Sequence, residues 1–315
     1  MTNALERGGL AHPALFYRTQ QEYLDFLLPF ISDAVDAGSP VLVAVPGPNL
    51  AALRDGLGDS AAHVVMTDMT EAGRNPGRIL GEVLSSFVEK HHGEPVRMIG
   101  EPIWPTRSEA EYPACVQHEA LINHAFTGRD VTVVCPYDVS RLAPDVVADA
   151  RCTHPVLWQP GSPEQRSLAY APDAVWARYD RPLPTHDAAV RYTARKLADL
   201  SRARNFAAGY GRWFGLPPSK IADLQLITNE LATASLTHSA GPCRLALWHQ
   251  DGHLVCEARD GGHLDDPLTG RRPYDLDTGR GPGLYVVNAV ADLVRIHSRP
   301  GETTIHAYIR LEETA

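Results

Sequence analysis

The feature that most constrains the fold is an alternation of continuous apolar runs with segments of helical periodicity. Apolar runs that predict strands lie at 41–45, 63–66, 96–100 and 130–135. Helical periodicity follows in segments at 20–37, 49–57, 76–90, 108–126 and 143–152. Strands that are apolar on both faces belong to a parallel sheet that helices cover on both sides. Residues 12–158 are therefore expected to form an α/β domain with a mostly parallel sheet.

The alternation ends near residue 158. Residues 159–185 contain Pro-Gly and Pro-x-Pro motifs and no long periodicity, which is typical of a linker with at most one short strand. The chain therefore divides into a domain at 1–158, a linker at 159–185 and a domain at 186–315.

The second domain has a different order of elements. Helical periodicity covers most of 188–213 and all of 219–238. Two hairpins are predicted, one of 243–249 with 253–259 around Asp251-Gly252, and one of 293–298 with 304–311 around Pro300-Gly301. A polar loop at 261–278 and a helix at 283–292 separate the hairpins. Long helices on one face of a mostly antiparallel sheet predict an α+β two-layer sandwich.

Bulk composition narrows the classes of function. The 315 residues include 44% hydrophobic and 21% charged residues, as in soluble globular proteins. The formal net charge of −9 supplies no basic field for phosphates, so direct nucleic-acid binding is not expected. No apolar run approaches ~18 residues, so no membrane span is expected either.

The five cysteines are scattered, odd in number and without a Cys-x-x-Cys pair. Such usage fits reduced thiols better than a disulfide framework or a zinc site. The first nine residues lack the apolar core of a signal peptide. A cytoplasmic location is therefore expected.

The segment 228–239 is the strongest functional motif, because its charged residues repeat at helical spacing. Glu230, Ala234 and His238 are four residues apart and share one helix face. A carboxylate on such a face can orient or deprotonate an incoming hydroxyl group. An amide oxygen one turn later would suit Mg²⁺, which prefers hard oxygen ligands.

Two glycine motifs follow this helix. Asp260 ends a predicted strand, where it can accept a hydrogen bond from an adenine amino group, and Gly262 lets the backbone pass close to the base. The Gly-x-Gly-x-Gly run at 279–283 can wrap phosphates with backbone N–H groups at the start of a helix. Each motif alone is weak, since a helical Glu is usually a solvated residue and Asp-Gly-Gly is usually a turn. Together, in this order, they predict an ATP pocket.

Residues from about 195 to 312 resemble the GHKL (Bergerat) ATPase domain, specifically its RsbW-like anti-sigma-factor serine kinase branch. The family's helix reads Glu-Leu-x-Thr-Asn-Ala-x-x-His-Gly, against Glu-Leu-Ala-Thr-Ala-Ser-Leu-Thr-His-Ser from Glu230 here. The resemblance implies that Glu230 is the catalytic base, that position 234 holds Mg²⁺ and that Asp260 and Gly262 contact adenine. It further implies that the nucleotide site includes His238, the ATP-lid residues Gly279, Arg280, Gly281, Gly283 and Leu284, and Thr304 beside the base.

Position 234 departs from the family pattern, because it is Ala where Asn is expected. A methyl group cannot ligate a metal, so ATP and Mg²⁺ binding and phosphoryl transfer should be weakened. Either the protein is a natural pseudo-kinase that regulates by binding, or the residue was introduced to inactivate it.

The resemblance implies a regulator that acts by partner switching, binding a sigma factor or phosphorylating a Ser of an anti-sigma antagonist with ATP. Related kinases dimerise, so a homodimer is also consistent with it. A non-catalytic protein-binding module is the alternative. A histidine kinase is disfavoured, because no phosphoacceptor helix with a dimerisation seam precedes residue 220.

Polar and aromatic residues in the first domain fall near the carboxyl ends of predicted strands, where open α/β sheets bind ligands. They form a candidate sensor pocket: Glu101, Trp104, His118, Glu119, Cys135, Tyr137 and His154. The alternative is that Trp104 and Tyr137 are core aromatics and that His118 and Glu119 are a polar helix face. A metal site is disfavoured, because no pair of ligands shows metal-site spacing.

These segments, over residues 12–158, resemble the MEDS sensory domain (methanogen/methylotroph, DcmR sensory). The resemblance implies a RecA-like core that binds a small organic signal. The segment 46–49, Pro-Gly-Pro-Asn, takes the place of a phosphate loop but lacks its Gly-Lys-Ser/Thr ending. ATP is therefore not expected in this domain.

Overall fold

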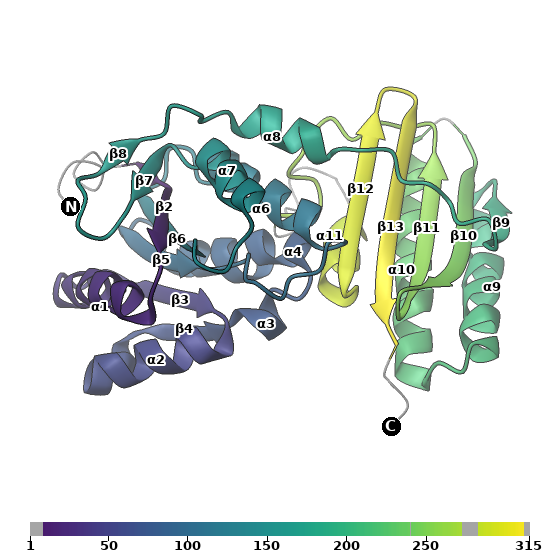
Figure 1. Cartoon of the computed structure of the whole chain (residues 1–315). Helices are drawn as coiled ribbons and strands as arrows, with labels where there is room; N and C mark the ends of the chain where they lie inside the picture. Colours follow the sequence, from purple (N-terminus) through teal and green to yellow (C-terminus); the bar gives the residue numbers. More distant parts are fainter. Residues whose placement is uncertain (1–8, 240, 273–282, 312–315) are drawn as a thin grey trace. The chain divides into compact units, whose positions relative to one another are not determined.

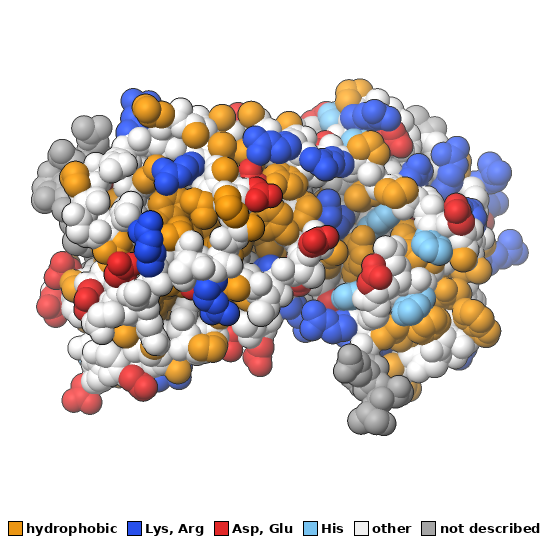
Figure 2. All heavy atoms as spheres, in the orientation of Figure 1, with side chains coloured by type: hydrophobic (Ala, Val, Ile, Leu, Met, Phe, Trp, Pro, Cys, Tyr) orange, Lys and Arg blue, Asp and Glu red, His pale blue; other side chains and the backbone are white. Residues whose placement is uncertain are grey.

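The computed structural model describes residues 9–239, 241–272 and 283–311. The chain forms two compact units, unit 1 up to Tyr179 and unit 2 from Asp180, each with its own sheet (Figure 1). Over unit 1, acidic, basic and apolar side chains are interspersed on the face that Figure 2 shows. Among the described residues, no helix combines the length and the hydropathy that crossing a membrane requires.

The sheet of unit 1 is mostly parallel, as predicted. Its strands follow the order β4-β3-β5-β6-β2-β7-β8, and β1 also pairs with β6. Among the described strands of unit 1, only the β7–β8 pair is antiparallel. The strands are β1 (Leu10–Ala11), β2 (Pro13–Tyr17), β3 (Val41–Val45), β4 (Val65–Asp68), β5 (Val96–Gly100), β6 (Val131–Asp138), β7 (Val156–Trp158) and β8 (Gln165–Arg166).

Helices cover both faces of this sheet, α1 and α2 on one side and α6, α7 and α8 on the other (Figure 1). The helical elements are α1 (Gln20–Asp36), α2 (Gly47–Leu57), η2 (Gly58–His63), α3 (Met69–Ala72), α4 (Pro76–Arg78), η3 (Ile79–Ser85), α5 (Ser86–Lys90), α6 (Tyr112–Ala125), α7 (Pro144–Thr153) and α8 (Pro172–Tyr179). The predicted helix at 76–90 is thus one run with a π-helical centre, η3.

The face of each β6 side chain follows from the alternation of residues along a strand. Val134 packs in the core with α1 and α2. Cys135 and Tyr137 therefore project to the opposite face, on which α6 and α7 lie. β2 was not predicted as a strand, although all five of its residues are buried.

The segment predicted as a linker, 159–185, is largely folded in the structure. β8 pairs with β7, and α8 packs against α6 and α7. The buried carboxylate of Asp149, on α7, accepts hydrogen bonds from Tyr112, Arg178 and Tyr179. These bonds join three helices, so the chain up to Tyr179 belongs to unit 1. The sequence lacked this signal because α8 has only eight residues.

The sheet of unit 2 is antiparallel throughout its described strands, in the order β12-β13-β11-β10-β9. Its strands are β9 (Val190–Ala194), β10 (Cys243–Gln250), β11 (His253–Asp260), β12 (Leu293–Arg299) and β13 (Glu302–Arg310). Its helical elements are η4 (Leu197–Asp199), α9 (Leu200–Trp213), α10 (Pro218–His238) and α11 (Gly283–Val290).

The helices of unit 2 pack on one face of its sheet, as predicted (Figure 1). Leu231 of α10 and Val287 of α11 lie in one core with Ala258 of β11 and Ile305 of β13. Both predicted hairpins form. Asp251 and Gly252 have φ of 48° and 71°, and two positive φ angles are the signature of the predicted two-residue turn.

The prediction that 188–213 is mostly helical is wrong at its start. Residues 190–194 form β9, which pairs with β10 at the edge of the sheet, and α9 begins only at Leu200. The physical reason lies in Val190, Tyr192 and Thr193, since β-branched and aromatic residues favour strands. Pairing with β10 stabilises this segment as a strand more than its weak helical periodicity favours a helix.

Candidate functional site

Helix α10 presents the predicted polar face beside a buried apolar one. Leu224, Ile227 and Leu231 are in the core of unit 2. On the other face Glu230 and Ala234 are half-buried, whereas His238 is exposed. The helix thus holds a carboxylate and a methyl group one turn apart at a partly open surface.

The Glu230 carboxylate lies beside the first residue of α11. A Cβ atom at Gly283 would lie 3.4 Å from Glu230 Oε2 and 3.6 Å from its backbone oxygen, which is van der Waals contact, so Gly283 lies directly beside Glu230. Asn229 Nδ2 donates to Glu230 Oε1 over 3.1 Å. The Asn229 oxygen in turn accepts from Arg204 Nη1 over 2.7 Å, which fixes the amide. Asn229 thereby orients the Glu230 carboxylate beside the start of α11.

The turn after β11 is the second part of the predicted site. Gly262 N–H donates to Asp260 Oδ1 over 2.7 Å. A Cβ atom at Gly262 would lie 2.9 Å from that oxygen and 3.1 Å from Ser239 Cβ, at the C-terminal cap of α10. A side chain at residue 262 would therefore displace the Asp260 carboxylate. The contact of Gly262 with adenine stays a prediction.

The register of β13 separates the two threonines near this turn. Thr303 is opposite Asp260 and Thr304 is opposite Arg259, and opposed residues project to the same face of a sheet. Thr303 therefore shares the helix-covered face with Asp260, and its hydroxyl donates to the Gly262 oxygen over 3.2 Å. Thr304, predicted beside the base, projects to the other face. The sequence analysis did not predict Thr303. It lies two residues before the core residue Ile305, and residues two apart on a strand project to the same face.

The remaining predicted nucleotide residues have different outcomes. Gly279, Arg280 and Gly281 lie outside the described residues. Leu284 is buried in the core and packs over Gly270, whose φ is +75° and where a Cβ would meet Leu284 Cγ at 2.5 Å. Leu284 is thus a packing residue in the structure.

A cavity of about 510 Å³ lies at the C-terminal end of α10. It is lined by Arg195, Lys196, Leu197, Leu236, Ser239, Gly241 and Pro242. Ser239, one of the lining residues, also approaches Gly262. The cavity therefore adjoins the predicted adenine turn without including Glu230 or Asp260.

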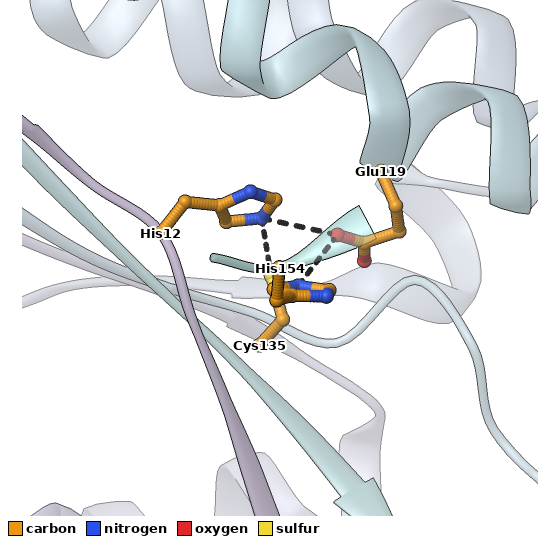
Figure 3. Close-up of side chains that lie close together, drawn as sticks. All are labelled: His12, Glu119, Cys135 and His154. Atoms are coloured by element: carbon orange, nitrogen blue, oxygen red, sulfur yellow. Dashed lines mark hydrogen bonds and ion pairs between the residues drawn. The ribbon is translucent and has the colours of Figure 1, made fainter. Parts of the chain in front are cut away.

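In unit 1 the structure brings together three of the seven predicted sensor residues, Glu119, Cys135 and His154, and adds His12. These four residues form what we call the His12 cluster (Figure 3). Their side chains are 0% or 1% exposed. The cluster is therefore part of the closed interior of unit 1.

Distances within the His12 cluster are short. Glu119 Oε2 lies 3.2 Å from Nε2 of both His12 and His154, and Cys135 Sγ lies 3.4 Å from His12 Nε2. Burial, and next the charge of His154, lowers the pKa of His12 to about 4, so its ring is neutral at physiological pH. Burial raises the pKa of the Cys135 thiol. Sequence reasoning missed His12 because it lies between two short strands.

The other predicted sensor residues are placed differently. The Tyr137 ring stands edge-on to His154, with ring centroids 5.5 Å apart. His118 is buried on α6 outside the cluster, and Trp104 is covered by the Arg107 guanidinium at 3.8 Å. The seven residues therefore do not form one pocket.

Glu101 belongs to a separate buried group. Asn49 Nδ2 donates to both of its oxygens, over 3.1 and 2.9 Å, and the Tyr23 hydroxyl donates over 3.4 Å. Burial outweighs these bonds and raises the pKa of Glu101 to about 8. The carboxyl group is thus largely protonated at neutral pH.

We expect Glu101→Gln to flatten the pH dependence of the stability of unit 1. The folded-state pKa of about 8 lies above the unfolded value, so Glu101 favours folding at low pH and loses that contribution as pH rises from about 5 to 8. The slope from one such group is at most about 1.4 kcal/mol per pH unit. Urea unfolding at several pH values should show the wild type losing stability relative to the variant as pH rises. Equal slopes would contradict the assignment, and Glu109→Gln, at an exposed position, is the control.

Comparison with known families finds a match within each unit. Residues 11–155 match the model of the MEDS domain (MEthanogen/methylotroph, DcmR Sensory domain), and residues 193–309 match the model of the histidine kinase-like ATPase domain. The chain therefore carries both domains. No curated protein matches the chain. Among solved structures, a chain of the SiaB–SiaC complex from Pseudomonas aeruginosa is 13% identical, with a TM-score of 0.31, covering 38% of this chain and 88% of that chain. A TM-score this low establishes no shared fold.

Proposed function

We propose that the protein is a signalling regulator, in which unit 2 binds an adenine nucleotide and a partner protein under the control of unit 1. The observation that carries the proposal is the paired geometry of unit 2. Asp260 and Gly262 meet the C-terminal end of α10, while Glu230 of the same helix meets the start of α11. Both features lie within the part of the chain that matches the histidine kinase-like ATPase domain.

The residues of the turn fit an adenine ring. Asp260 Oδ1 accepts a hydrogen bond from the Gly262 N–H. Within the described ranges, Asp260 Oδ2 accepts no hydrogen bond. Oδ2 is therefore suited to accept a bond from an adenine amino group. Gly262 and Thr303 hold the turn in place. ATP, when bound, would supply a phosphoryl group, and Glu230 would orient a serine hydroxyl of the partner.

The residues do not fit a magnesium ion held by α10. Ala234 offers no ligand atom, and the nearest amide on this helix, Asn229, has its oxygen engaged by Arg204. No phosphoryl-transfer step through magnesium is therefore assigned. This favours the second candidate, a module that binds its partner and transfers phosphate poorly or not at all.

We infer the partner and the signal by analogy with the families that the two units resemble. Unit 2 would act by partner switching, holding a sigma factor or an anti-sigma antagonist in the manner of RsbW-like proteins. Unit 1, as the sensory domain, would take a small organic molecule as its signal. Both assignments rest on family analogy and on no contact in the structure.

Asp260→Asn is expected to weaken ATP binding at least about tenfold, since it replaces an acceptor oxygen with an amide. Isothermal titration calorimetry of the full chain with ATP measures this. Asp265→Asn is the matched control, because Asp265 is exposed in the loop that follows. An equal loss of ATP affinity in both variants, or no loss in either, would show that Asp260 is not part of the nucleotide site.

A further inference from the structure

The four side chains of the His12 cluster come from four separate parts of unit 1. His12 lies between β1 and β2, Glu119 is on α6, Cys135 is on β6 and His154 is the C-terminal cap of α7. Their potential ligand atoms all lie within 4.8 Å of one another (Figure 3). Four elements distant in sequence thus direct nitrogen, oxygen and sulfur atoms toward one buried point.

The outer hydrogen bond of His154 fixes its tautomer. His154 Nδ1 lies 2.8 Å from the Ala150 carbonyl oxygen, which can only accept. Nδ1 therefore carries the hydrogen. In the neutral ring Nε2 then presents a lone pair, and it lies 3.2 Å from Glu119 Oε2.

Asn123 fixes His12 in the same way. The Asn123 amide nitrogen donates to the backbone oxygens of Ala120 and Thr153, over 3.1 and 2.9 Å. Its oxygen must therefore face His12 Nδ1, at 3.2 Å, and accept from it. His12 Nε2 is left with a lone pair toward Glu119 and Cys135.

Two imidazole lone pairs therefore converge on a buried carboxylate. Without a cation, this contact requires an added proton on an imidazole or on Glu119. Glu119 Oε1 has no hydrogen-bond partner in the described part of the chain, and no Lys or Arg there forms an ion pair with Glu119. A buried charge without a compensating partner is costly. A divalent cation would balance one carboxylate and one thiolate and would accept both imidazoles.

We propose that His12, Glu119, Cys135 and His154 bind a zinc ion. Zn²⁺ takes imidazole, carboxylate and thiolate ligands tetrahedrally, and bonds of about 2.0–2.3 Å place ligand atoms about 3.3–3.7 Å apart. The contacts of 3.2, 3.2 and 3.4 Å in the cluster come close to that spacing. Each histidine also gives its outer N–H to an oxygen, as zinc-bound histidines do.

The site is closed. All four ligands come from the protein and all are buried, which is the pattern of a structural rather than a catalytic zinc. The ion joins the start of the sheet, α6, β6 and the end of α7. Binding zinc therefore stabilises the fold of unit 1 and does not depend on nucleotide binding in unit 2.

The test uses the untagged full chain, purified without chelators. Elemental analysis is expected to find about one zinc per chain. The chain stripped of metal and titrated with Co²⁺ should show the visible bands of tetrahedral cobalt and a sulfur-to-cobalt charge-transfer band. A chain that contains no zinc above the buffer blank and gives no such bands would overturn the proposal.

Variants assign the ligands. Cys135→Ser is expected to abolish the charge-transfer band, and His154→Gln to lower the zinc content several-fold. Cys152→Ser is the matched control, because Cys152 is on α7 outside the cluster, and it should retain both signals. Retention of the band in Cys135→Ser would contradict the assignment. If these variants do not fold, the zinc content and the cobalt spectrum of the wild type still decide.

Discussion

Ala234→Asn is expected to make ATP binding depend on magnesium and to raise the affinity about tenfold when Mg²⁺ is present, which corresponds to about 1.4 kcal/mol. Residue 234 is one helical turn from Glu230 on the same half-buried face of α10. Asparagine at this position would place an amide oxygen where it can bind a cation beside the phosphates. The wild-type methyl group has no such atom.

Calorimetric titration with ATP, in magnesium and in EDTA, measures the change. Ala222→Asn controls for the lower helix propensity of Asn, since Ala222 is exposed on the same helix. An affinity that Ala234→Asn leaves unchanged in magnesium would exclude position 234 from the metal site. An equal gain in ATP affinity in Ala234→Asn and Ala222→Asn would also exclude position 234 from the metal site.

A fragment of unit 1 that ends at residue 165 is expected to be less stable, by about 3–5 kcal/mol, than a fragment that ends at Tyr179. The shorter fragment lacks α8, and with it the fully buried Val175, whose burial is worth about 1.5–3 kcal/mol. It also removes Arg178 and Tyr179, the partners of the buried Asp149 carboxylate. Hydrogen bonds to a charged group are worth about 1.5–3 kcal/mol each, and the conformational entropy lost on ordering α8 offsets part of these contributions.

Urea unfolding of the two fragments, followed by circular dichroism, tests this expectation. The fragment that ends at Tyr179 serves as the control, because the compact unit ends there. Equal midpoints for both fragments would show that α8 contributes nothing and that the region after 158 is a linker, as its composition suggested.

Sequence periodicity predicted most elements but not those that depend on distant partners. The continuous apolar run at 41–45 and the helical periodicity at 219–238 identify a strand and a helix, and the structure confirms both. The edge strand β9 was mistaken for helix because its stability comes from pairing with β10. β2 was also missed, although it has the same length as β3.

The candidate sites show the same limit. The four-residue spacing placed Glu230 and Ala234 on one face of a helix, which local geometry alone determines. The His12 cluster joins residues up to 142 positions apart, between His12 and His154, so no spacing rule could identify it. Thr303 was missed because the face of a strand residue depends on the register of the sheet.

Calorimetric titration of the wild-type full chain with ATP tests whether unit 2 is a nucleotide-binding domain. We expect saturable binding of one ATP per chain, with nearly the same affinity in magnesium and in EDTA, because Asp260 and Gly262 are in place and Ala234 offers no metal ligand. Absence of saturable binding, or binding that requires magnesium, would contradict it.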